Sequence, residues 1–165
     1  MLRTVLFALG ASLPLLVGGA LGAVWKPPRQ LVAVALAYGI PENLALGVSL
    51  VEGGSIALLV AVFASNFPEA IAGTASMRDQ GRSRRSIIGL WSGATLLLAL
   101  AVVAGRLLFA GSSPSQLALP LAFAGGAVLV SVIDTLAPEA FRDGGPYIAL
   151  ASAAGFFTAF LLSVE

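Results

Sequence analysis

Two glutamates within apolar stretches are the residues of this sequence best suited to do chemistry. Glu69 follows Pro68 directly and lies three residues after Asn66 and four residues after Ser65, in the run VFASNFPEAIAGTASM. Residues spaced in this way share one face of a helix. That face would carry a carboxylate, an amide oxygen and a hydroxyl, which are donors that suit divalent cations. The spacing therefore predicts a metal-binding face.

The second glutamate, Glu42, also follows a proline, Pro41. Proline has no N–H and clashes with the carbonyl one turn earlier, so each Pro–Glu pair would place a freed carbonyl oxygen near a carboxylate. We expect Glu42 and Glu69, in adjacent antiparallel helices, to meet near the middle of a membrane and share one ion. The alternative is structural: the two acids share a proton, or they pair with Arg106.

Two further acids are weaker candidates for metal binding. Asp134 lies within an apolar stretch, and Glu139 follows a proline in APEAFRDGG. Because Glu139 has Arg142 nearby in a polar segment, its expected role is to cap a helix end or to form an ion pair there.

The composition predicts the environment of the chain. Of its 165 residues, 58% are hydrophobic and only 10% are charged, which is too few charges to cover a water-soluble domain of this size. The apolar residues form unbroken blocks, unlike the alternating strands of a membrane barrel. We therefore expect an all-α, polytopic membrane helix bundle in a single domain, 1–165. At about 20 residues per crossing, its six spans would be 2–24, 31–50, 55–77, 86–110, 115–137 and 146–164.

The basic residues predict the orientation. In a six-span arrangement, seven of the nine fall on one side, and the loop RDQGRSRR holds four of these. Since basic loops stay in the cytoplasm, this side would be cytoplasmic and both termini would lie outside the cell (inner) membrane. The seven are Lys26, Arg29, Arg78, Arg82, Arg84, Arg85 and Arg142.

Several function classes are disfavoured. The chain has no His and no Cys, which removes the commonest transition-metal ligand and the thiolate nucleophile. It also has neither an H-E-x-x-H motif nor a Walker A motif. We expect neither an enzyme nor a nucleic-acid-binding protein, and the expected partners are the lipid bilayer and divalent metal ions.

Several motifs resemble those of the ZIP metal transporters, particularly the bacterial branch. IPENLALGVSLVEGG resembles the HNxPEGLAVG motif of that family's fourth helix, and SNFPEAIAGTASMR resembles its fifth-helix N-x-P-E motif. The resemblance implies a helical bundle, often a homodimer, that passes divalent metal ions such as zinc, iron or manganese. Carried over by position, Glu42, Asn66 and Glu69 would be metal ligands, with Ser65 as a weaker one.

The chain also departs from that family pattern. The His and Asn that begin the first motif are Tyr38 and Gly39 here, and Thr95 stands where many bacterial members have an acid. The chain also has no room for the family's eight helices at about 20 residues each, and is shortened by about two. These departures keep open an alternative, a non-transporting, ZIP-derived membrane protein with a structural or partner-binding role.

Overall fold

The computed structural model describes residues 1–22 and 31–163, and this part of the chain is helical apart from short turns. The segment between the first two predicted spans, which contains Lys26 and Arg29, lies outside the described residues. The helices are α1 (Leu2–Gly22), α2 (Leu31–Ser49), α3 (Ile56–Asp79), α4 (Arg84–Leu108), α5 (Pro114–Ser131), the π-helical segment η1 (Val132–Leu136), α6 (Ala137–Gly144) and α7 (Tyr147–Ser163).

The helix boundaries lie close to the predicted spans, because turn-forming residues separate the apolar runs. Ser55 caps α3 by accepting a hydrogen bond from the backbone N–H of Leu58 at 3.1 Å. Ser83 does the same for α4, accepting from the N–H of Ser86 at 3.3 Å. A turn joins α2 to α3, where Gly53 and Gly54 have positive φ angles, 114° and 87°, which side-chain-bearing residues rarely adopt.

Two helices continue through residues that commonly break helices. Helix α2 runs through Pro41 without interruption. The fifth apolar run does not stop before Pro138 either, because η1 and α6 continue it to Gly144. In both places, proline is accommodated within helical structure, as it is in helices whose neighbours pack against them.

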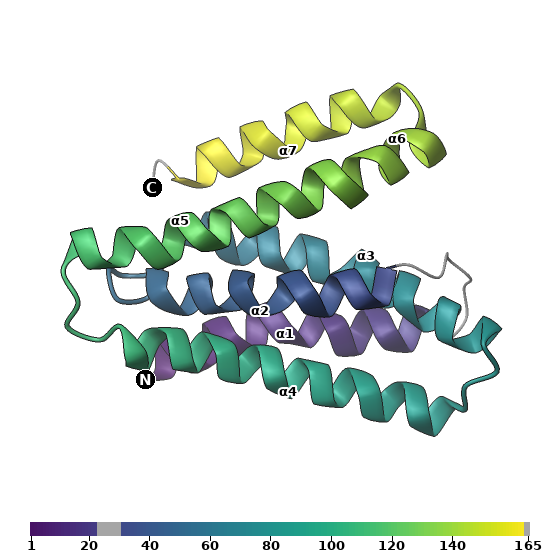
Figure 1. The fold of residues 1–165 in the computed structure, drawn as a ribbon, viewed down its shortest axis with the longest axis horizontal. Coiled ribbons are helices and arrows are strands. Elements are labelled where there is room, and N and C mark those ends of the chain that lie inside the picture. The colour runs from purple at the N-terminus through teal and green to yellow at the C-terminus, as the bar shows by residue number, and fades with distance from the viewer. Residues whose placement is uncertain (23–30, 164–165) are drawn as a thin grey trace.

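The long helices run back and forth with nearly aligned axes, so that the two termini lie at one end of the molecule (Figure 1). Helix α1 packs chiefly against α3 and α4, and α2 packs chiefly against α4 and α5. Two clusters of buried side chains fill these contacts. One includes Phe7, Leu46, Val62 and Val102, and the other includes Leu15, Ala70, Trp91 and Leu98.

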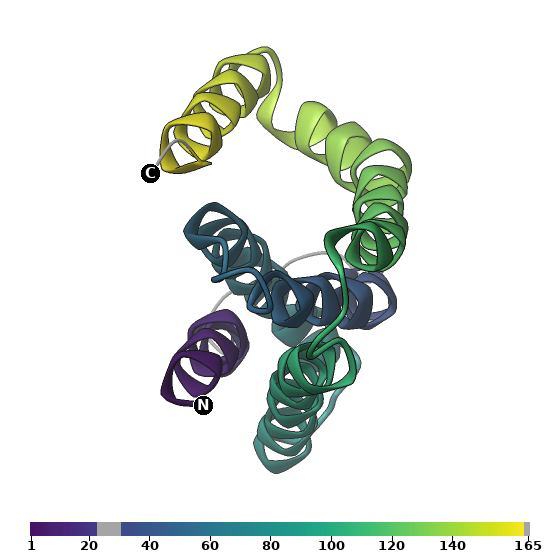
Figure 2. The same cartoon turned by 90° about the vertical axis from the view of Figure 1, so that its left-hand side faces the viewer.

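Helices α5, α6 and α7 form an outer arm that curves away from the other four helices (Figure 2). The described side chains of α7 include no buried one, and Phe156 is 78% exposed. An apolar surface of this kind is unfavourable in water, but lipid tails can cover it.

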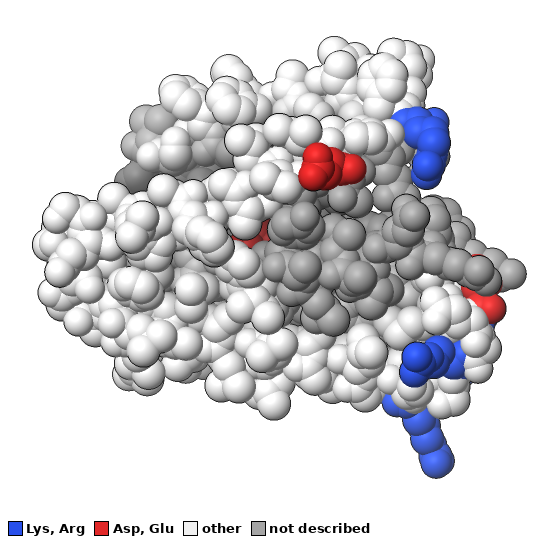
Figure 3. All heavy atoms as spheres, viewed as in Figure 1, with Lys and Arg blue, Asp and Glu red and all other residues white. Residues whose placement is uncertain are grey.

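Four of the described helical stretches are long and apolar enough to cross a membrane: Leu2–Ala20, Ile56–Asp79, Arg84–Leu108 and Pro114–Asp134. The arginines visible in Figure 3 gather at the end of the molecule opposite the termini, and white, uncharged atoms dominate the rest of that face. The all-α class is thus confirmed for the described residues, whereas six membrane spans and a ZIP-like arrangement stay predictions.

Candidate functional site

Helix α3 carries three of the predicted ligands, at different depths. Glu69 and Ser65 are half-buried, whereas Asn66 is only 1% exposed. The Ser65 hydroxyl donates a hydrogen bond to the Val62 carbonyl at 3.1 Å, so it is turned back along its own helix. A hydroxyl oxygen engaged in this way keeps lone pairs and can still be a weak ligand.

Asn66 has a structural contact that the sequence analysis missed. Its Nδ2 donates to the carbonyl oxygen of Ala11 on α1 at 2.7 Å. The amide therefore joins α3 to α1. The neighbouring carbonyl, that of Gly10, lacks its usual helical donor because Pro14 has no N–H. The spacing of Asn66 and Glu69 correctly placed them on neighbouring parts of one helix, but it could not reveal that the amide nitrogen was already engaged.

Helix α2 contributes Glu42, which is half-buried, and Asn43, which is fully buried. Asn43 Nδ2 donates to the Gly39 carbonyl at 2.8 Å. Its Oδ1 has no hydrogen-bond partner among the described residues, and neither has Thr95 Oγ1 on α4. Buried polar atoms normally find a partner, so both atoms are available to water or to an ion. In the sequence, Thr95 stood out only by its place in the family resemblance, and Asn43 only as a polar residue within an apolar run.

Glu42 and Glu69 lie on helices that contact each other, α2 and α3, and the charge of Glu42 acts on Glu69. That the two carboxylates share one ion stays a prediction. Within the described part of the chain, no lysine or arginine pairs with either carboxylate. The predicted structural pairing with Arg106 is therefore not seen. Two half-buried acids of the same sign repel each other, so a cation or a shared proton is needed to stabilise the pair.

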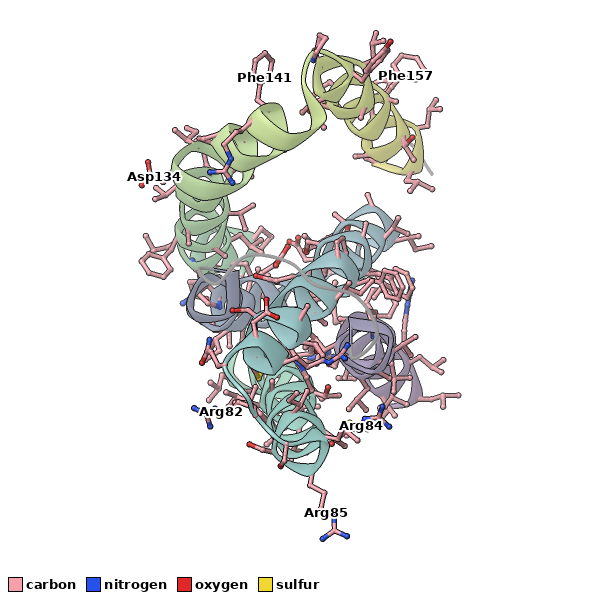
Figure 4. The ribbon with its side chains drawn as sticks, turned by 90° about the vertical axis from the view of Figure 1, so that its right-hand side faces the viewer. Arg82, Arg84, Arg85, Asp134, Phe141 and Phe157 are labelled. Atoms are coloured by element: carbon pink, nitrogen blue, oxygen red, sulfur yellow. The ribbon has the colours of Figure 1, made fainter. Side chains whose placement is uncertain are left out.

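The remaining candidates lie apart from this pair. Asp134 is exposed on η1, and Figure 4 shows its side chain pointing away from the bundle. Glu139 belongs to α6, but its side chain is outside the described part of the structure. Among the described residues, no three His, Cys, Asp or Glu side chains lie together as a metal cluster. The candidate site therefore consists of the Glu42–Glu69 pair, with Asn43, Ser65 and Asn66 along the same two helices.

A second buried polar contact connects the helices that surround this pair. The Trp91 indole N–H on α4 donates to Thr74 Oγ1 on α3 at 2.7 Å, and both side chains are buried. The same indole ring lies over Gly19 of α1, where an added Cβ would come within 2.7 Å of it. Trp91 thereby holds three helices together, so it has a structural role beside the site.

Comparison of the chain with protein-family models, curated proteins and solved structures found no match.

Proposed function

We propose that this chain is a multi-pass membrane protein that carries a divalent cation through the Glu42–Glu69 pair, in the manner of a ZIP-type transporter. The observation that supports this most is the pair itself: two half-buried carboxylates on adjacent helices, with no basic partner among the described residues. Their combined charge equals and opposes that of one divalent cation.

The energetic argument favours a cation at this position. A carboxylate in the middle of a membrane helix costs roughly 2.5–3.5 kcal/mol on insertion scales, and a second one beside it adds repulsion. A bound divalent ion removes both penalties, whereas a shared proton neutralises only one of the two charges. The cation is then expected to be held by Glu42 and Glu69, with Asn66 and Ser65 supplying weaker oxygens.

The proposed site fits transient rather than permanent binding. A resident structural metal usually has a closed set of protein ligands, and the described residues offer only two charged ones. A carrier must also release its ion, and a site with few oxygen ligands binds the ion weakly enough to allow release. With no His in the chain, the expected substrates are zinc, iron or manganese bound weakly through oxygen.

The end of the molecule with the arginine-rich turn is expected to face the cytoplasm, since basic loops stay inside. Both termini lie at the opposite end (Figure 1) and would therefore be outside the cell (inner) membrane. No enzymatic step is proposed.

A second candidate is a non-transporting protein in which the two acids share a proton. The observation in its favour is the lack of a three-residue acidic cluster within the described chain.

Transport of ions into proteoliposomes separates the two functions. Vesicles containing the wild-type chain and a trapped metal-sensitive dye should show uptake of manganese or zinc, and Glu42→Gln/Glu69→Gln should reduce uptake to that of protein-free vesicles. Glu52→Gln, at an exposed turn, is the matched control and should keep full uptake. Wild-type flux equal to that of protein-free vesicles would favour the non-transporting protein.

A further inference from the structure

Four exposed arginines lie at and beside the turn between α3 and α4. Arg78 is in the last turn of α3, Arg82 lies in the connecting turn, and Arg84 and Arg85 begin α4. Figure 4 looks onto this end and shows the labelled side chains of Arg82, Arg84 and Arg85 spreading away from one another and from the bundle. Because guanidinium groups form paired hydrogen bonds with phosphate oxygens, this turn is suited to phosphate groups.

The start of α4 also favours binding of an anion. The amino end of a helix carries a partial positive charge and favours acidic residues. The first turn of α4 has no acid and instead contains Arg84 and Arg85. These two charges oppose the helix dipole, so an anion placed between them and the exposed N–H groups is stabilised by both.

The outer face of α4 changes from charged to apolar within one turn. Arg85 is followed at helical spacing by Ile88, Ser92 and Leu96, so these side chains share a face. Ile88 is 59% exposed and Leu96 is 61% exposed. Beside them lies Gly93, where an added Cβ would meet no atom within 4 Å. Apart from Ser92, this face is apolar and exposed, and it continues along α4 from Arg85.

We propose that this surface binds an acidic phospholipid, with its headgroup phosphate at Arg85, in the positive field to which Arg84 adds, and its acyl chains along Ile88 and Leu96. A soluble anion would use the arginines alone, whereas a lipid also covers the exposed apolar face. The proposed ligand is thus an anionic lipid of the membrane leaflet next to the α3–α4 turn. The inference depends on membrane insertion but not on metal transport.

Competition between two lipids tests the proposal. The full-length chain in neutral detergent receives equal amounts of phosphatidylglycerol and phosphatidylcholine with identical acyl chains, and native mass spectrometry counts the lipids retained. Wild type should retain phosphatidylglycerol over phosphatidylcholine by about fivefold or more, which is the effect expected for one arginine near an anionic headgroup. Arg84→Gln/Arg85→Gln should bring the ratio close to one.

The control removes the same number of charges from the opposite end. Arg3→Gln/Arg106→Gln should keep the wild-type preference. High salt should reduce the preference of the unmutated chain for phosphatidylglycerol, because salt screens exposed charges. This measurement does not depend on the folding of any variant. Equal retention of both lipids by wild type, or an unchanged ratio in Arg84→Gln/Arg85→Gln, would overturn the proposal.

Discussion

Gly47 on α2 and Gly105 on α4 lie face to face, so close that neither position has room for a side chain. A Cβ on Gly47 would overlap the carbonyl oxygen of Val102, and one on Gly105 would overlap that of Leu44. The Gly47 Cα is 3.2 Å from the position that a Gly105 Cβ would take. Small residues allow this backbone approach, which stabilises helix pairs in lipid. The contact fixes α2, and with it Glu42, against α4.

Gly105→Ala should lower the free energy of unfolding by about 1–3 kcal/mol, the usual cost of forcing extra atoms into a packed contact. Gly93→Ala is the matched control on the same helix, since its Cβ would enter open space. The control should keep or slightly raise stability, because alanine favours helix more than glycine does. Thermal unfolding in detergent measures both, and equal melting temperatures for the two variants would contradict the close contact.

Thr74→Val should leave the buried indole N–H of Trp91 without its acceptor and lower stability by about 1–3 kcal/mol. Thr74→Ser retains the hydroxyl and should cost less than the valine variant. Denaturation followed by tryptophan fluorescence compares them. If serine costs as much as valine, the methyl packing of Thr74 matters rather than its hydrogen bond.

Asn66→Ala should weaken the chain even without metal, by about 1 kcal/mol, because it removes the hydrogen bond to the Ala11 carbonyl. Glu69→Gln should not weaken the metal-free protein, since it removes one of two repelling charges. Melting temperatures of the two variants in a chelating buffer, compared with that of wild type, distinguish a residue that links two helices from one that acts only as a metal ligand. A metal-free Asn66→Ala variant as stable as wild type would mean that the amide acts only on the ion.

The orientation can be tested independently of the site. A reporter active only in the cytoplasm should be silent when fused after Glu165 and active when inserted at Gly81, in the turn between α3 and α4. The reason is the concentration of arginine at that turn and the position of both termini at the other end (Figure 1). The opposite pattern would reverse the proposed direction of the molecule.

Much of the helical layout follows from the sequence, because the apolar runs are separated by residues that favour turns and caps. Ser55 and Ser83 cap the helices that the runs predict. Helix α2 continues through Pro41 for a tertiary reason. Proline removes one backbone hydrogen bond, but Gly39 and Gly47 let α2 pack closely on α4 on either side of it, and packing outweighs local propensity.

The candidate site could be predicted only in part. Helical spacing placed Asn66 and Glu69 on one helix, and the repeated Pro–Glu pair made Glu42 the candidate partner acid. The spacing could not show that Asn66 donates to α1, because that contact joins residues 55 positions apart. Nor could it show that Asp134 points outward (Figure 4), because an acid within an apolar run does not reveal which face of the helix meets the bundle.

Calorimetric titration with manganese, zinc and magnesium tests the carboxylate pair most directly. The wild-type chain should bind one of these ions, Glu69→Gln should lose that binding, and Glu52→Gln should retain it. Loss is expected because a neutral amide cannot balance the cation's charge, whereas Glu52 lies on an exposed turn. Equal binding by wild type and Glu69→Gln, or no binding by wild type, would contradict the proposal that Glu42 and Glu69 hold a divalent ion.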